Sequence, residues 1–140
     1  MKSLVIAHRI LTTDLTGTFV ASTGVNTMGL PHHNLAITYD PDEADGRLAV
    51  EFQGTMDGPE VTDANAEWIT LGTVARTAGV IAFTADDIRS NSAGAGTKNQ
   101  LNVSYIDQPF QRMRIRAKET FTGGGTNQGN AKIDQISWTN

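Results

Sequence analysis

Carboxylates gather in one short segment of the chain, where they could bind a cation. Asp40, Asp42, Glu43 and Asp45 stand just before Gly46, and oxygen ligands at such close spacing are what Ca²⁺ requires. The spacing does not match an EF-hand loop, because the third of its alternating side-chain ligands would be an alanine. The segment therefore predicts a solvated turn between two strands, with calcium binding as the alternative.

Histidines and serines show no catalytic or zinc-binding pattern. His32 and His33 are adjacent after Pro31, and neighbouring side chains of an extended chain point in opposite directions, so the pair does not share one ion. No serine stands in a Gly-x-Ser-x-Gly turn, although a triad could still assemble from distant residues. With no cysteine in the chain, we predict no enzyme, no cofactor and no metal site.

A strand near the C-terminal end carries cations on one of its faces. Between residues 112 and 118, apolar and basic residues alternate strictly, which places them on opposite sides of a strand. The cations are Arg112, Arg114, Arg116 and Lys118. We predict that they form an interface with another protomer or with a charged partner surface; a solvated strand face is the alternative.

Charge is distributed unevenly along the chain, whose net charge is −4. Residues 40–67 hold nine acids and one base, a balance of −8, whereas residues 98–132 hold six bases and two acids, a balance of +4. The net negative charge argues against a general nucleic-acid partner, and no stretch approaches the roughly 18 apolar residues of a membrane span. Two patches of opposite sign suit a head-to-tail contact between copies or docking on a charged surface.

Strand-forming residues dominate the elements that must position these groups. Thr, Val and Ile together make up 36 of the 140 residues, and β-branched side chains favour strands. Helical sequence is confined to Thr84–Arg89, one turn at most. The expected strands are Lys2–Ile10, Gly17–Ser22, Leu35–Tyr39, Leu48–Phe52, Glu67–Val74, Val80–Thr84, Leu101–Ile106, Arg112–Lys118 and Ala131–Trp138.

Short strands separated by turn residues, without long helices, favour an antiparallel β fold. We predict an all-β protein, an antiparallel jelly-roll-like β-sandwich of about eight or nine short strands. Residues 1–140 should form a single domain with an extended N-terminal arm at 1–16, because the length fits one core. The glycine-rich segments 90–97 and 122–129 are expected to be mobile loops.

Three segments carry a resemblance to a known group of proteins. They are Phe52–Gly58 followed by Glu67–Gly72, then Pro109–Arg116, and finally Ile133–Trp138. Together they resemble tailed-phage virion proteins with small β-sandwich domains, in which a strand ends in a Ser/Thr-x-Asp-Gly turn and the next opens with a tryptophan. Here the turn is Thr55–Gly58, residues 59–66 are inserted after it, and Trp68 is expected to anchor the returning strand in the core.

The resemblance implies a structural role in a virion. It points to a capsid decoration (cement) protein on the outer capsid surface, a homotrimer that clamps neighbouring copies of the major capsid protein and needs no cofactor, nucleic acid or membrane. In that role the interface with the capsid or with another protomer would be formed by Arg112, Arg114, Arg116 and Lys118. The alternative is a carbohydrate-binding or receptor-binding β-sandwich module of a head fibre or tail. In that case Trp138, close to the C-terminus, would stack on a sugar ring.

Overall fold

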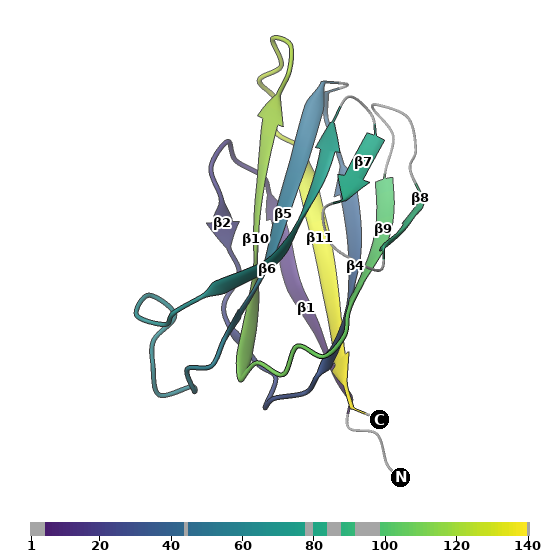
Figure 1. Ribbon diagram of the computed structural model, residues 1–140. Coiled ribbons are helices and arrows are strands. Elements are labelled where there is room, and N and C mark those ends of the chain that lie inside the picture. Colours follow the sequence, from purple (N-terminus) through teal and green to yellow (C-terminus); the bar gives the residue numbers. More distant parts are fainter. Residues whose placement is uncertain (1–4, 44, 78–79, 84–87, 92–98, 140) are drawn as a thin grey trace.

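The computed structural model describes residues 5–43, 45–77, 80–83, 88–91 and 99–139; within residues 5–14, 72–91 and 99–101 it describes the backbone only. Two antiparallel sheets pack face to face as a sandwich (Figure 1). The described residues contain no helix, so the predicted all-β sandwich is confirmed. No described segment is a helix long and apolar enough to cross a membrane.

Five strands form the first sheet, in the spatial order β1-β11-β4-β9-β8. Their bounds are Val5–Asp14 (β1), His32–Asp40 (β4), Ile88–Asn91 (β8), Asn99–Tyr105 (β9) and Asn130–Trp138 (β11). The N-terminal segment that was expected as an arm contributes β1, which pairs with β11 from Val5 opposite Trp138 to Asp14 opposite Asn130. Residues 5–14 are therefore an edge strand of the sandwich.

Six strands form the second sheet, in the order β2-β10-β5-β6-β7, with β3 also paired to β10. Their bounds are Val20–Ala21 (β2), Val25–Asn26 (β3), Gly46–Thr55 (β5), Ile69–Thr77 (β6), Val80–Phe83 (β7) and Arg112–Phe121 (β10). Because β2 pairs with Arg116 and Ala117 and β3 with Arg112 and Met113, the two short strands share one place beside β10.

The strand order is that of a jelly roll. With β2 and β3 counted as one position, β1-β11-β4-β9 faces β2/β3-β10-β5-β6, and the chain crosses repeatedly between the sheets. Two four-stranded sheets connected in this way are the jelly-roll arrangement found in capsid and lectin domains. Strands β7 and β8 add one strand to each sheet.

Two of the expected elements differ from the structure by more than a shift of their ends. The expected strand Gly17–Ser22 is reduced to the two residues of β2. In the expected helical turn, residues 84–87 lie outside the described residues, while Ile88 and Arg89 belong to β8, opposite Val103 and Asn102. The helical prediction is wrong for those two residues, because sheet pairing outweighs a weak local preference.

Alternation along the strands builds the core. The inward side chains of both sheets are almost fully buried and form one apolar cluster, which fixes the face of each central strand. Its members include Leu35, Ile37 and Tyr39 of β4, Leu48, Val50 and Phe52 of β5, Val103 and Tyr105 of β9, Met113, Ile115 and Ala117 of β10, and Ala131 and Ile133 of β11. The cations of β10 must therefore lie on the outer face of the second sheet.

Candidate functional site

The four predicted cations do lie together on the outer face of β10, but they differ in exposure. Met113, Ile115 and Ala117 point into the core, and the intervening Arg114, Arg116 and Lys118 are half-buried on the opposite face. Arg112 is only 6% exposed. The prediction from alternation thus placed the residues correctly, whereas their contacts depend on other parts of the chain.

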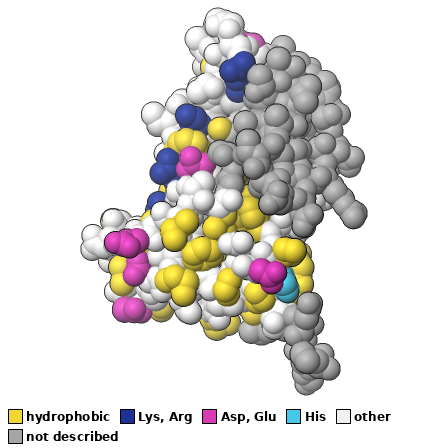
Figure 2. Space-filling view, viewed as in Figure 1, with side chains coloured by type: hydrophobic (Ala, Val, Ile, Leu, Met, Phe, Trp, Pro, Cys, Tyr) yellow, Lys and Arg dark blue, Asp and Glu magenta, His cyan; other side chains and the backbone are white. Residues whose placement is uncertain are grey.

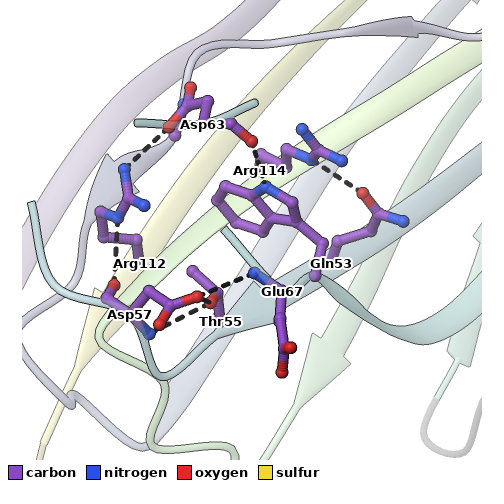
Figure 3. A network of polar contacts seen from close by, with 9 residues as sticks. Gln53, Thr55, Asp57, Asp63, Glu67, Arg112 and Arg114 are labelled. Atoms are coloured by element: carbon purple, nitrogen blue, oxygen red, sulfur yellow. Dashed lines mark hydrogen bonds and ion pairs between the residues drawn. The ribbon is translucent and has the colours of Figure 1, made fainter. Parts of the chain in front are cut away.

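Arg112 is held by the connection between β5 and β6, residues 56–68. Its terminal nitrogen Nη1 forms an ion pair of 2.8 Å with Asp63, and its Nε donates to the carbonyl oxygen of Asp57 (Figure 3). Asp63 also accepts a hydrogen bond from the backbone N–H of Gly24 at 2.7 Å. Arg112 therefore fastens this connection onto the sheet and has little surface left for a partner.

Arg114 lies against Trp68 in the same network. Its guanidinium carbon is 4.3 Å from the centre of the Trp68 ring, and its Nε donates to the side-chain oxygen of Gln53 at 2.8 Å. Burial, and then the neighbouring charge of Arg116, lower the pKa of Arg114. A cation on an aromatic face is favourable when it is partly desolvated, so Trp68 stabilises the position of Arg114.

Arg116 and Lys118 share a second aromatic ring. Both cationic groups lie 4.6 Å from the centre of the Phe19 ring, and Arg116 forms an ion pair with Glu51 of β5. Phe19 comes from the segment just before β2. We call Arg114, Arg116 and Lys118 the basic stripe, since these are the half-buried cations of the strand.

Trp68 is not the core anchor that the sequence resemblance predicts. Its indole N–H donates to the carbonyl oxygen of Asp63 at 2.9 Å, and the ring covers Arg114 on the outer face of the sheet. The inserted residues 59–66 explain the difference, because they bring the carbonyl oxygen of Asp63 within hydrogen-bonding distance of the indole N–H. That expectation is therefore wrong.

Further hydrogen bonds order the 56–68 connection. One carboxylate oxygen of Asp57 accepts from the hydroxyl of Thr55 at 3.1 Å and from the backbone N–H of Glu67 at 2.8 Å (Figure 3). The carbonyl oxygen of Thr55 accepts from the N–H of Gln111 in the β9–β10 connection. The loops at this end of the sandwich are thereby linked to one another.

Large apolar side chains are exposed at the same end of the sandwich. They are Met28 at 55%, Met56 at 63%, Ile69 at 55% and Ile106 at 51%, and we call them the apolar end. Backbone hydrogen bonds connect their loops: the N–H of Met28 donates to the carbonyl oxygen of Gln111, whose own N–H donates to the carbonyl oxygen of Thr55. Ile69 lies opposite Gly54 in the pairing of β5 with β6, and the ring of Phe110 packs against Gly54. In the view of Figure 2, hydrophobic side chains gather over the lower part of the molecule.

The apolar end was missed by the sequence interpretation. In three of its four members the signal is a large apolar residue beside a turn residue: Met28 before Gly29, Met56 before Asp57-Gly58, and Ile106 before Asp107. Met28, Gly29 and Asp107 have positive φ angles, which mark tight turns. Turns project neighbouring side chains outward, so these residues reach the surface.

The acidic turn has a structural role. Asp45 accepts from the backbone N–H groups of Gly123 and Gly125, and Glu43 accepts from those of Thr126 and Asn127. These bonds hold the loop between β10 and β11, at the top of Figure 1, which the sequence predicted to be mobile. Among the described residues no group of three or more potential ligands surrounds a metal position, and the two carboxylates that face the loop are occupied by its amides.

A serine and a histidine do meet, but in the interior. His33 Nε2 lies 2.9 Å from the carbonyl oxygen of Gln108 and must donate to it, so Nδ1 accepts from the hydroxyl of Ser137 at 2.8 Å. Gln135 donates to the same hydroxyl. His33 and Ser137 are both 0% exposed, so this pair fastens the β9–β10 connection to the first sheet and faces no surface.

Trp138, the residue named for sugar stacking, is half-buried. Its ring packs against His32 with 5.7 Å between ring centres, tilted by 44°. Part of the indole is thus covered by the chain itself.

Comparisons with solved structures show the same fold in viral and prophage proteins. The SPBc2 prophage-derived protein YomS matches with a TM-score of 0.51 and 6% identity, over 99% of this chain and 96% of that one. Infectious bursal disease virus of the Gx strain matches with a TM-score of 0.59 and 12% identity over 99% of this chain. The VP2 subviral particle of that virus matches with a TM-score of 0.54 and 12% identity over 98% of this chain.

This chain spans about a third of the two viral chains, 32% and 33% respectively, and nearly all of the prophage protein. No protein-family model and no curated protein matches the sequence. At these identities the likeness concerns the fold alone.

Proposed function

We propose that this protein is a virion structural protein, a capsid decoration protein that binds the outer surface of a phage head as a homotrimer and clamps neighbouring copies of the major capsid protein. The observation that carries the proposal is the jelly roll itself, whose described strands run from Val5 to Trp138, and which is shared with a prophage protein matched over 96% of its length. The sequence resemblance to phage virion proteins agrees with it.

The described surface suits a mechanical role. The loops at the apolar end are fastened by buried or half-buried polar contacts. Binding through them therefore costs little conformational entropy, because the loops are already ordered. A protein bound across a joint between capsid subunits stabilises that joint by about 2.7 kcal/mol when its concentration is 100 times its Kd. Several linked copies add to this through avidity.

Heating of virions with and without the protein tests the proposal. Because binding free energy is withdrawn at every joint, particles that lack the protein should release their genome at a lower temperature, and adding back the purified chain should restore the original value. Equal release temperatures, with no binding of the added chain to the particles, would rule out a decoration role.

A carbohydrate-binding or receptor-binding module remains the alternative. Its expected contact is Trp138, whose ring is partly covered by His32. Glycan-array binding that is lost in Trp138→Ala, together with an unchanged release temperature, would favour this alternative. Absence of glycan binding in the wild-type chain would count against it.

A further inference from the structure

We propose that the apolar end of one copy docks onto the basic stripe of a second copy, so that the protein assembles through a head-to-side contact. This inference rests on the homo-oligomer of the proposed function and names the two surfaces that build it. Both surfaces are on the described part of the chain, and they differ in charge and in position.

Exposed acidic side chains stand close in sequence to three members of the apolar end. Glu60 comes four residues after Met56, Glu67 two residues before Ile69, and Asp107 directly after Ile106. We call Glu60, Glu67 and Asp107 the acidic rim. Among the described residues none of the three carboxylates forms an ion pair, and the one arginine at this end, Arg112, is buried against Asp63. An apolar surface with such a rim fits a partner that offers cations beside apolar area.

The basic stripe offers that combination. Arg116 and Lys118 lie on the half-buried ring of Phe19, and Arg47 of the neighbouring strand adds a further cation opposite Thr120. Within the described residues, Glu51 of β5 pairs with one cation of the stripe, Arg116. Figure 2 shows Lys and Arg side chains along one edge of the molecule, above the hydrophobic area.

The far part of the basic stripe lies apart from the acidic rim within one copy. Arg112 is opposite Thr55, where the apolar end begins, and Lys118 lies six residues further along β10, about 20 Å away at about 3.3 Å per residue. Arg114 is nearer, because its guanidinium covers Trp68, the residue between Glu67 and Ile69. Salt screens charges beyond about 10 Å, so Lys118 and its neighbour Arg116 are the cations that the stripe offers to the acidic rim of another copy.

The contact joins two different surfaces, so it is heterologous. Each copy can then bind one neighbour through its apolar end and another through its basic stripe, and the assembly closes as a ring when the rotation between copies permits. The homotrimer expected for a decoration protein is such a ring.

Charge reversal on the purified chain tests the contact by sedimentation velocity. Glu60→Lys/Glu67→Lys changes only exposed side chains of the acidic rim, and Arg116→Gln/Lys118→Glu changes the stripe without placing a second carboxylate directly opposite Glu51. Each pair alone should weaken self-association by at least about tenfold. The chain that carries all four substitutions should associate more strongly than the Glu60→Lys/Glu67→Lys chain. Arg116→Gln/Lys118→Glu lowers the charge of the stripe from +3 to 0 (Arg114 +1, Gln 0, Glu −1), which removes its repulsion of the two new lysines.

Ile69→Thr and Ile136→Thr test the apolar part. The two isoleucines are 55% and 45% exposed, but Ile136 lies on β11 of the other sheet, so it serves as the matched control. Ile69→Thr should weaken association, and Ile136→Thr should leave it unchanged.

Three outcomes overturn the inference. The first is a wild-type chain that stays monomeric at every concentration in low salt. The second is an oligomer that neither pair of substitutions affects. The third is an oligomer that Glu60→Lys/Glu67→Lys weakens but Arg116→Gln/Lys118→Glu leaves unchanged, which would indicate a contact between two apolar ends. If the chain self-associates as proposed but virions that lack it release their genome at an unchanged temperature, the decoration role is overturned instead. A monomer that still protects virions overturns only the contact between copies.

Discussion

The phenol of Tyr39 on β4 donates a hydrogen bond to the carboxylate of Glu119 on β10, so a polar contact crosses the sandwich between its two sheets. The second oxygen of Glu119 accepts from the backbone N–H of Gly129 at 2.6 Å, and Glu119 is 0% exposed. The backbone of Glu119 in turn donates to the carbonyl oxygen of Thr16. One buried carboxylate thus joins β4, β10, the start of β11 and the segment after β1.

Tyr39→Phe should destabilise the fold. It leaves one oxygen of a buried carboxylate without its donor, which costs about 1–3 kcal/mol of unfolding free energy. The matched control is Tyr105→Phe: the Tyr105 hydroxyl is buried without a partner among the described residues, and burial raises the pKa of Tyr105 to about 12. Chemical denaturation should show a loss for Tyr39→Phe and no loss for Tyr105→Phe; equal losses would contradict the role of the Glu119 contact.

Asp63→Ala should loosen the 56–68 connection and lower stability. It removes the anion that pairs with Arg112 and accepts from Gly24. Hydrogen bonds to charged groups are worth about 1.5–3 kcal/mol, and the partial exposure of Asp63 favours the lower part of that range. Glu60→Ala, an exposed change in the same connection, should stay within about 0.5 kcal/mol. Urea denaturation of the two variants checks the difference, and a neutral Asp63→Ala would show that the ion pair does not stabilise the fold.

Acidification should destabilise the protein through His33. Burial lowers the pKa of His33 from its ordinary value of 6.5, so the unfolded chain binds a proton there before the folded chain does. The stabilisation is therefore complete above pH 6.5 and is lost as the pH falls toward the lower folded-state pKa. The free energy of unfolding should therefore fall as the pH drops below about 7, by about 1.4 kcal/mol for each unit that separates the folded from the unfolded pKa.

Denaturation at a series of pH values checks the role of His33. In His33→Gln this part of the pH dependence should disappear, whereas His32→Gln, which keeps His33, should retain it. A slope that is unchanged in His33→Gln would assign the effect to other groups.

Asp45→Ala should release the loop between β10 and β11. The carboxylate accepts from the amides of Gly123 and Gly125, so those amides should exchange with solvent deuterium faster in the variant. Asp42→Ala, an exposed change in the same turn, is the control. Exchange that is equally slow in both variants would mean that the loop is held by other contacts.

Sequence periodicity predicted the parts of this protein that depend on neighbouring residues. The alternation in Arg112–Lys118 placed Met113 and Ile115 in the core and the cations outside, because successive side chains of a strand must point in opposite directions. Likewise, the content of β-branched residues and the spacing of turns predicted two sheets without long helices. These are local properties of the chain, so they can be predicted without contacts.

Tertiary structure alone decided what the charged and aromatic side chains contact. Asp63 meets Gly24 across 39 residues of sequence and Arg112 across 49, while Glu43 and Asp45 reach the 122–129 loop about 80 residues away. No periodicity relates such positions, because their meeting depends on strand order and on the path of each connection. For the same reason the sequence predicted the basic stripe but neither its two aromatic rings nor the apolar end: these form only where loops from distant parts of the chain come together at one end of the sandwich.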